Sequence, residues 1–418
     1  MFFSNTQSCP SLSDYSIDIE HHTTRSVSKQ AIDKRFNENT RSMLTRLLED
    51  VISAQVKRKS VFNDDLFPEI RIMDSTEFVV SNNLSDTFPG YGGSGREAIA
   101  QVQLEYELLG GKVTQMSLGS SLDSDALAGM KHIDQIPPKT LLIRDLGYSS
   151  PKAFKQISQH ELYFVSRAKA QWSMYEKQNG KLRKITVEDI KSRLMKTKQK
   201  YIDMEIFVGS QVRTPVRLIA NFLSKGQTQK RIKKKKAKGL PVSKLAKESA
   251  CLNLFVTNVE KDKCSASQIY DLYTLRWQIE LIFKTWKSIL KIHKTHPMNA
   301  LRLECVILIK FIWVMLNWSL LKLIEEVSNT EISYHKFSRT MMSRSMMLNL
   351  TILQDPGLFL NWLNRLFEIS RKHHLKEYKK GTKSIGIILQ KYNTVMNNKY
   401  IFTVHKPATS VAFNNYGK

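Results

Sequence analysis

The amino-acid sequence predicts an α/β fold, in which helices flank a mixed β-sheet. Three observations predict it: an alternating strand pattern surrounds Asp74, a short buried strand stops at Asp145, and an amphipathic helix occupies 268–293. A hairpin and short helices lie between these elements, and such a mixed order is typical of a sheet covered by helices. The length of 418 residues, 42% of them apolar, is enough for two or three domains with a substantial core.

The first strand is predicted in PEIRIMDSTEFVV, residues 68–80, where apolar residues alternate on both sides of Asp74. The glycine-containing segment 85–98 follows. Its glycines match neither a P-loop nor a dinucleotide-binding fingerprint, so we interpret this segment as a turn.

A hairpin is predicted next, because residues 99–119 alternate on both sides of Gly110-Gly111, a strong turn signal. Asp123 or Ser124 can cap the short helix after it. The buried run in KTLLIRDLGYSS, residues 139–150, then stops at Asp145. Ser150-Pro151 begins a helix, and residues 161–169 form another buried strand.

Three further strands are predicted over 201–210, 214–222 and 250–259, and a basic run at 229–249 separates the last two. Such dense like charge predicts a solvated loop. In so basic a chain we favour a loop that contacts the DNA backbone, since phosphate contacts need charge but little structure. A solvated loop without a partner remains the alternative. The candidate contacts are Lys233, Lys234, Lys235 and Lys236.

The predicted helix 268–293 has an apolar stripe at helical spacing, formed by Leu272, Leu275, Ile279, Ile282, Phe283, Trp286 and Leu290. At about 100° per residue, a polar set falls inside an arc of roughly 80° beside that stripe. Its members are Tyr273, Arg276, Glu280, Lys284 and Lys287. A solvated face with weak ion pairs also explains this pattern, and for the helix alone it is the commoner explanation.

Both ends of the chain are predicted to be helical. Near the start, Ser26 or Ser28 can cap a helix, and a second helix should present one apolar face made of Met43, Leu47, Leu48, Val51 and Ile52. The two helices suit either a helix-turn-helix on DNA or a bundle without a DNA role. Near the end, the apolar window 305–324 is interrupted by Lys310, Asn317 and Lys322, so we expect a buried core helix and not a membrane span.

Composition bounds the function. The formal net charge of +26 calls for a polyanionic partner, and because the excess is spread along the chain, nucleic acid is favoured over a membrane surface or the ribosome. Four cysteines without a C-x2-C pair, and no secretion signal, predict a reducing, cytoplasmic location. The chain has no HExxH zinc motif and no serine or cysteine nucleophile signature.

Three motifs carry a resemblance. The spacing Tyr-x2-Arg-x3-Glu-x6-Lys is met by Tyr273, Arg276, Glu280 and Lys287. It resembles the signature of family 4 of bacterial insertion-sequence transposases, which are DDE enzymes. The phrases RIMDST and RDLGY are similar to that family's first and second motifs, and SVSKQAIDKRF is similar to a phrase in its amino-terminal DNA-binding region.

The resemblance implies a ribonuclease-H-like catalytic core over 66–169 and 263–297, interrupted at 170–262 by a strand-rich insertion. It also implies a helical DNA-binding region at 1–65, which we expect to be shortened, and a helical region at 298–418. Relatives use a tryptophan in the insertion to hold a flipped base. No tryptophan lies between Trp172 and Trp277, so that feature is not transferred.

The resemblance further implies that Asp74, Asp145 and Glu280 are catalytic and bind two Mg²⁺ ions, for which Mn²⁺ can substitute. The rival carboxylates Asp86, Asp123, Asp125 and Glu77 have poorer positions, some of them at helix caps. Tyr273, Arg276 and Lys287 would then bind DNA phosphates and assist a DNA-hairpin step.

The implied activity is Mg²⁺-dependent cleavage and strand transfer of double-stranded DNA at the ends of an insertion sequence, by a homodimer in the synaptic complex. The enzyme would be cytoplasmic in a bacterium and associated with the nucleoid when bound to DNA. Two alternatives stay open: an inactive or non-catalytic DNA-binding relative of the same fold, and a structure-specific nuclease that never joins ends.

Overall fold

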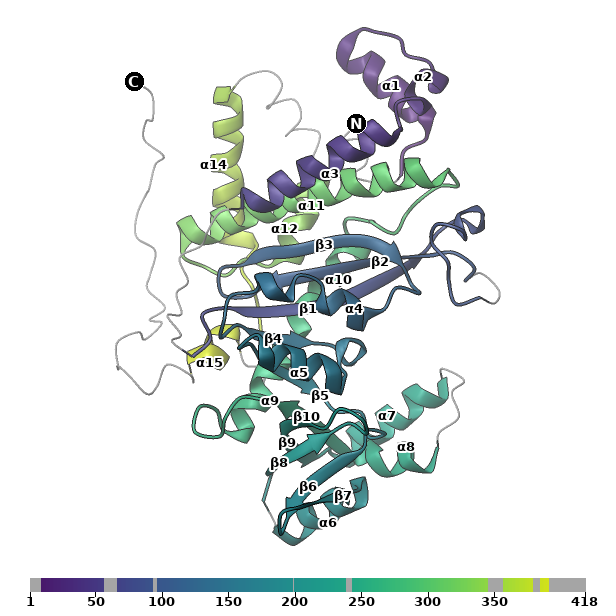
Figure 1. Cartoon of the computed structure of the whole chain (residues 1–418). Helices are drawn as coiled ribbons and strands as arrows, with labels where there is room; N and C mark the ends of the chain where they lie inside the picture. The colour runs from purple at the N-terminus through teal and green to yellow at the C-terminus, as the bar shows by residue number, and fades with distance from the viewer. Residues whose placement is uncertain are drawn as a thin grey trace.

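One ten-stranded sheet runs through the molecule, and helices cover it (Figure 1). The computed structural model describes residues 9–55, 66–92, 96–197, 199–237, 243–344, 356–378 and 384–390. The strand order is β3-β2-β1-β4-β5-β10-β9-β8-β6-β7. The predicted mixed α/β architecture is therefore confirmed. The strands are β1 Ile70–Val79, β2 Ile99–Glu107, β3 Lys112–Ser120, β4 Leu141–Arg144, β5 Tyr163–Arg167, β6 Met174–Gln178, β7 Lys181–Ile185, β8 Ile202–Val208, β9 Thr214–Phe222 and β10 Leu252–Thr257.

The pairing of β1 with β4 brings the two predicted aspartates together. The two strands are parallel, and their register ends with Met73 opposite Arg144. Asp74 follows Met73 in β1, and Asp145 follows Arg144 at the end of β4. The two aspartates therefore lie side by side on neighbouring segments. On its other edge β1 pairs antiparallel with β2, the first strand of the predicted hairpin. Gly111 turns that hairpin with a φ of 72°, a conformation that glycine adopts without strain.

The helices between these strands begin where the sequence predicted. Ser124 caps α4 (Asp125–Met130) by accepting a hydrogen bond from Leu127 N, and Ser150 caps α5 (Pro151–Gln159). Capping serines satisfy backbone N–H groups that have no partner inside the helix.

Strands β6 to β10 continue the same sheet, because β10 pairs antiparallel with β5. The three strands predicted between 201 and 259 are confirmed as β8, β9 and β10. The hairpin of β6 and β7 and helix α6 (Val187–Thr197) were not predicted. Strands β6 and β7 are short and largely polar, with a burial pattern that does not alternate, so the sequence carries no strand periodicity there.

The prediction of a basic loop was wrong for its first half. Residues 233–236 lie in helix α7 (Lys225–Ala237), which has no glycine or proline after Gly226. Lysine is a good helix former, and the inner side of the helix is held by Arg231. The Arg231 guanidinium donates to Leu252 O at 2.7 Å and to Asn253 Oδ1 at 2.8 Å. Residues 238–242 of the basic run lie outside the described residues, and α8 (Lys244–Glu248) follows them.

The single helix predicted over 268–293 is two helices, α9 (Ala266–Thr274) and α10 (Trp277–Ser288). At the junction the backbone hydrogen bonds span three residues instead of four, as in Leu275 N to Leu272 O at 3.0 Å and Arg276 N to Tyr273 O at 3.2 Å. Leu275 and Arg276 keep right-handed helical dihedrals, and neither is a helix-breaking residue that would mark the junction in the sequence. All seven residues of the predicted apolar stripe are buried.

The first helices pack onto a long C-terminal one. They are α1 (Leu12–Thr23), α2 (Lys29–Asp33) and α3 (Glu38–Ser53), and α3 lies along α11 (Ala300–Ser328) (Figure 1). Ion pairs of Arg41 with Glu304 at 3.0 Å and of Arg302 with Asp33 at 2.7 Å fasten them. Ser28, and not Ser26, caps α2.

The predicted apolar face of the second helix was partly wrong. Leu44 and Leu48 are buried, whereas Met43 is 57% exposed and Leu47 is 36% exposed. The partner α11 selects the face that carries Leu44 and Leu48, four residues apart, and the neighbouring positions turn to solvent.

Helix α11 is the core helix that its sequence predicts. In the described chain it is the one helix long and apolar enough to cross a membrane, but 67% of its most apolar window is buried inside the protein. Its polar residues have partners: Lys310 Nζ donates to Lys294 O at 2.7 Å, and Lys322 pairs with Glu325 at 2.8 Å. Burial lowers the pKa of Lys310 to about 8. The remaining helices are α12 Tyr334–Ser343, α14 Pro356–His373 and α15 Ile385–Gln390.

The packing of α3 predicts different costs for two neighbouring leucines. Leu48→Ala empties a buried position against α11 and should destabilise the protein by about 2–4 kcal/mol. Leu47→Ala, the matched control, should cost about 1 kcal/mol or less. Urea unfolding of the two variants measures the difference, and equal costs would contradict the observed orientation of α3.

Candidate active site

Three predicted carboxylates from distant parts of the chain line one opening at the sheet. Asp74 lies in β1, Asp145 directly follows β4, and Glu280 lies in the first turn of α10. The strand register places the two aspartates, and the tight junction before α10 brings Glu280 up to them. The other residues that line the opening are Ser75, Thr76, Lys234, Arg276, Phe283, Lys284 and Lys287.

The guanidinium of Arg276 stands between the three carboxylates. Its Nη1 donates to Asp74 Oδ2 at 2.8 Å, its Nε lies 3.8 Å from Asp145 Oδ1, and its Nη2 donates to Glu280 Oε1. The Arg276 side chain is 16% exposed and that of Asp74 is 15% exposed, so this pair is largely shielded from solvent, whereas Glu280 is 32% exposed and Asp145 is 44% exposed. Charged hydrogen bonds are stronger there than in open water.

Burial is the main cause that changes the titration of Asp74. Burial and, to a smaller degree, the charges of Asp145 and Glu280 raise the pKa of Asp74, which stands at about 6. The Ser75 N–H and the Arg276 guanidinium act in the opposite direction. Burial alone would lower the pKa of Arg276, but the Tyr273 phenol and the three carboxylates raise it above its ordinary value.

Tyr273 lies beside this cluster, with its hydroxyl near the Arg276 side chain. The guanidinium carbon of Arg276 is 5.9 Å from the centre of the Tyr273 ring, within range of a cation–π contact. Neither the Tyr273 hydroxyl nor Arg276 Nε has a hydrogen-bond partner among the described residues. Burial raises the pKa of Tyr273 to about 12, so the hydroxyl remains a donor at neutral pH.

The predicted lysines surround the opening at different distances. Lys287 Nζ donates to the backbone O of Glu77 at 2.8 Å, and burial lowers the pKa of Lys287. Lys234 reaches the opening from α7, while Lys233 and Lys236 are exposed on the same helix. The side chain of Lys235 lies outside what the structure describes.

Sequence reasoning left Lys284, Ser75 and Thr76 out of the candidate site, although all three line the opening. A signal for Lys284 was present, because it falls within the polar arc of the predicted helix. Thr76 shares a strand face with Asp74 by the two-residue period. Nothing in the sequence indicates that Lys234, among the lysines of its run, lines the opening.

The rival carboxylates do not line this opening. Asp123 accepts from Ser120 N at 2.8 Å and Asp125 from Gln103 Nε2 at 2.8 Å, so both hold local structure. Glu77 accepts from the Tyr91 hydroxyl at 2.6 Å, and Asp86 is exposed.

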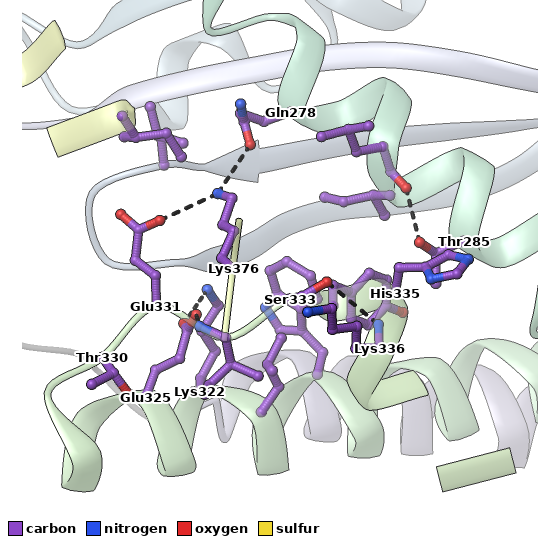
Figure 2. A pocket seen from close by; sticks show the side chains of 18 of the residues that line it. Gln278, Thr285, Lys322, Glu325, Thr330, Glu331, Ser333, His335, Lys336 and Lys376 are labelled. Atoms are coloured by element: carbon purple, nitrogen blue, oxygen red, sulfur yellow. Dashed lines mark hydrogen bonds and ion pairs between the residues drawn. The ribbon is translucent and has the colours of Figure 1, made fainter. Parts of the chain in front are cut away.

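Another cavity lies away from this opening, between α10, α11 and the chain near Lys376 (Figure 2). It measures about 500 Å³. Within it Lys376 pairs with Glu331 at 3.4 Å and approaches Gln278 Oε1 at 3.5 Å. None of the three clustered carboxylates lines it, so its size does not mark it as the reactive place.

The cluster fits divalent metal ions by the chemistry of its donors. Carboxylate oxygens are hard ligands that suit Mg²⁺ and Mn²⁺, and three of them converge on one positive group. In the described part of the chain, no group of three or more His, Cys, Asp or Glu side chains is already arranged to hold a metal ion. The Arg276 guanidinium takes the central position instead.

Comparison with known proteins shows similarity to transposases. Residues 65–316, which include all three carboxylates, match the family model described as "Transposase DDE domain". The chain is 31% identical over 404 residues to the transposase for insertion sequence element IS231F of Bacillus thuringiensis subsp. israelensis, covering 88% of this chain and 83% of that protein. It is 29% identical over 335 residues to the IS1151 transposase of Clostridium perfringens, covering 74% and 70%.

Similarity to solved structures is weak. The piggyBac transposase synaptic complex with hairpin DNA aligns with 92% of this chain and 71% of its own, at 13% identity and a TM-score of 0.39. A similarity this low supports no conclusion about the present chain.

The raised pKa of Asp74 predicts a pH-dependent gain from Asp74→Asn in metal-free buffer. The pKa of Asp74 is about 6 in the folded protein and about 3.9 in the unfolded chain, so ionisation of Asp74 destabilises the folded state. The protein therefore loses stability as the pH rises from about 4 to 6. Asparagine resembles the neutral acid. The variant should therefore match the wild type near pH 4 and exceed it by about 2–3 kcal/mol at pH 7.5.

Urea unfolding with EDTA at both pH values measures this gain. A difference that does not change with pH, or a less stable variant at pH 7.5, would contradict the assigned environment of Asp74.

Proposed function

This chain belongs to the family of transposases with a DDE domain, and from that premise we propose that it cuts DNA at the ends of an insertion sequence and joins it to a target. The observation that carries the proposal is the convergence of Asp74, Asp145 and Glu280 from β1, the end of β4 and α10. The relatives named above are transposases for insertion sequence elements, which supports the same activity.

In this proposal Asp74, Asp145 and Glu280 hold two Mg²⁺ ions, for which Mn²⁺ can substitute. Bound there, the metal ions would neutralise charge on the phosphoryl group and activate the attacking oxygen. The protein's own contribution is to fix three carboxylates on rigid elements. Strand register and buried helix packing supply that rigidity.

The cationic neighbours would bind the DNA phosphates next to the reacting bond. Arg276 can engage two phosphate oxygens at once, and the unpartnered Tyr273 hydroxyl can donate to a third. Lys287 adds positive charge from the last turn of α10. The spacing of these residues with Glu280 supports membership of family 4, and with it a DNA-hairpin step during excision.

We further propose that strands β1 to β5 and helices α9 and α10 form a ribonuclease-H-like core, with boundaries at 66–169 and 263–297. Residues 170–262 would be the insertion, the helices of 1–65 a DNA-binding region, and 298–418 the C-terminal region. Exposed Lys29, Lys34 and Arg35 support DNA contact by the first region. The protein would act as a homodimer on double-stranded DNA in the bacterial cytoplasm.

The basic outer side of α7 is the proposed backbone-contacting surface. Arg231 faces the sheet, Lys233 and Lys236 are exposed, and Lys234 lines the opening that holds the three carboxylates. A helix of this kind can follow phosphates without reading bases.

Glu280→Gln should abolish cleavage and strand transfer while leaving DNA affinity nearly unchanged, because one metal-binding carboxylate is lost and no positive charge is removed. A cleavage and joining assay with Mg²⁺ or Mn²⁺, run beside a mobility-shift assay, measures both. Asp86→Asn, an exposed carboxylate away from the opening, is the control and should stay active. Full activity of Glu280→Gln would refute the assignment. DNA cleavage without joining by the wild-type protein would indicate a nuclease.

The α7 surface predicts a change in salt dependence. The double variant Lys233→Gln/Lys236→Gln should lower the slope of log affinity against log salt by about 0.9 for each lysine that contacts a phosphate. Lys372→Gln, exposed on α14 at the opposite end of the molecule (Figure 1), should leave the slope unchanged. Identical slopes for the double variant and the control would exclude α7 from the DNA path.

A further inference from the structure

We propose that Arg276 is an exchangeable counter-ion of the active site: its guanidinium occupies the place of the divalent ions in the DNA-free protein and is displaced when they bind. This inference rests on the proposed function. It assigns to Arg276 a role before DNA arrives, in addition to phosphate binding.

The first support is geometric. One guanidinium contacts carboxylates from β1, from the end of β4 and from α10, at 2.8 Å to Asp74 and 3.8 Å to Asp145, with Glu280 in direct hydrogen bond. Metal ions held by these three carboxylates would bind the oxygens that the guanidinium now contacts. The guanidinium and the metal ions therefore cannot occupy this space together. Metal binding therefore requires the guanidinium to leave.

The second support is that Arg276 is incompletely satisfied where it stands. Its buried Nε has no hydrogen-bond partner among the described residues, although a guanidinium can donate five hydrogen bonds. The contact to Asp145 is longer than a hydrogen bond. A divalent ion carries twice the charge and approaches carboxylate oxygens to about 2.0–2.1 Å, so it should compete successfully.

The third support is that a destination exists. The guanidinium already lies 5.9 Å from the Tyr273 ring, and the nearby Tyr273 hydroxyl, which makes no hydrogen bond of full geometry, is an acceptor to which it can turn. Rotation of the side chain about its own bonds would keep the contact with the ring while releasing the carboxylates. Arg276 is then free to receive a phosphate when the metal ions are in place, which couples metal loading to DNA binding.

Mn²⁺ titration of the DNA-free full-length protein at pH 7.5, followed by the electron paramagnetic resonance signal of free Mn²⁺ and by calorimetry, tests the proposal. Arg276→Gln removes the competing charge and should bind Mn²⁺ at least about tenfold more tightly than the wild type. Lys284→Gln is the matched control: it removes a positive charge at the rim that has no ion pair with the three carboxylates, and should change affinity by less than about threefold.

Arg276→Lys keeps the charge but replaces the planar fork with a single ammonium, so its affinity should fall between the wild type and Arg276→Gln. Circular dichroism shows which variants are folded. If Arg276→Gln does not fold, the decision rests on Arg276→Lys, which must still bind more tightly than the wild type.

Two outcomes would overturn the proposal, and they are distinguishable. If the wild type binds Mn²⁺, Glu280→Gln weakens that binding, and Arg276→Gln is no tighter than Lys284→Gln, then the exchange is wrong while the metal site stands. If neither the wild type nor any variant binds Mn²⁺, both the exchange and the metal-dependent function proposed above are wrong.

Discussion

The mutual repulsion of three carboxylates is the constraint on which this structure depends. Asp74, Asp145 and Glu280 can stand together only because a guanidinium is held among them. Arg276 and Glu280 lie one helical turn apart, whereas the two aspartates come from adjacent parallel strands. The junction between α9 and α10 is the point where these two local arrangements meet, and its tightened hydrogen bonds place Arg276 over the strand ends.

Much of the surrounding structure fixes that junction. On one side, Trp286 of α10 is buried and donates to the Tyr334 hydroxyl at 3.0 Å. On the other side, the buried guanidinium of Arg217 makes a bidentate pair with Asp203 and donates to the carbonyls of Val259 and Cys264, just before α9 begins. Strands β8 and β9 therefore help to set where α9 starts, so the outer half of the sheet supports the site without lining it.

The sequence predicted those parts that local patterns determine. Strand alternation, the Gly110-Gly111 turn and the serine caps gave the inner half of the sheet, because each is a property of a few neighbouring residues. The break within the helix predicted over 268–293 could not be predicted from the sequence, since Leu275 and Arg276 are good helix formers and the break arises from tertiary packing.

The same reason explains the other errors. Met43 and Leu47 are as apolar as their neighbours, and only the position of α11 decides which face of α3 is buried. The dense charge of the lysine run in α7 predicts a loop. Its helix is held by hydrogen bonds from Arg231 to acceptors on β10. In the site, the motif spacing identified Arg276 as a phosphate ligand but not as the partner of all three carboxylates, because its contact with Asp74 joins residues 202 positions apart in sequence.

A net charge of +26 and a cluster of acidic groups are compatible because they act over different distances. The long-range field of the chain attracts DNA, and it falls off over about 8 Å in physiological salt. At the opening the balance is local: three carboxylates face Arg276, with Lys234, Lys284 and Lys287 around them. Metal ions add positive charge to this place and phosphates add negative charge. An active site that starts close to local neutrality can accept both together more readily than either alone, which favours chemistry only when metal and DNA are present at once.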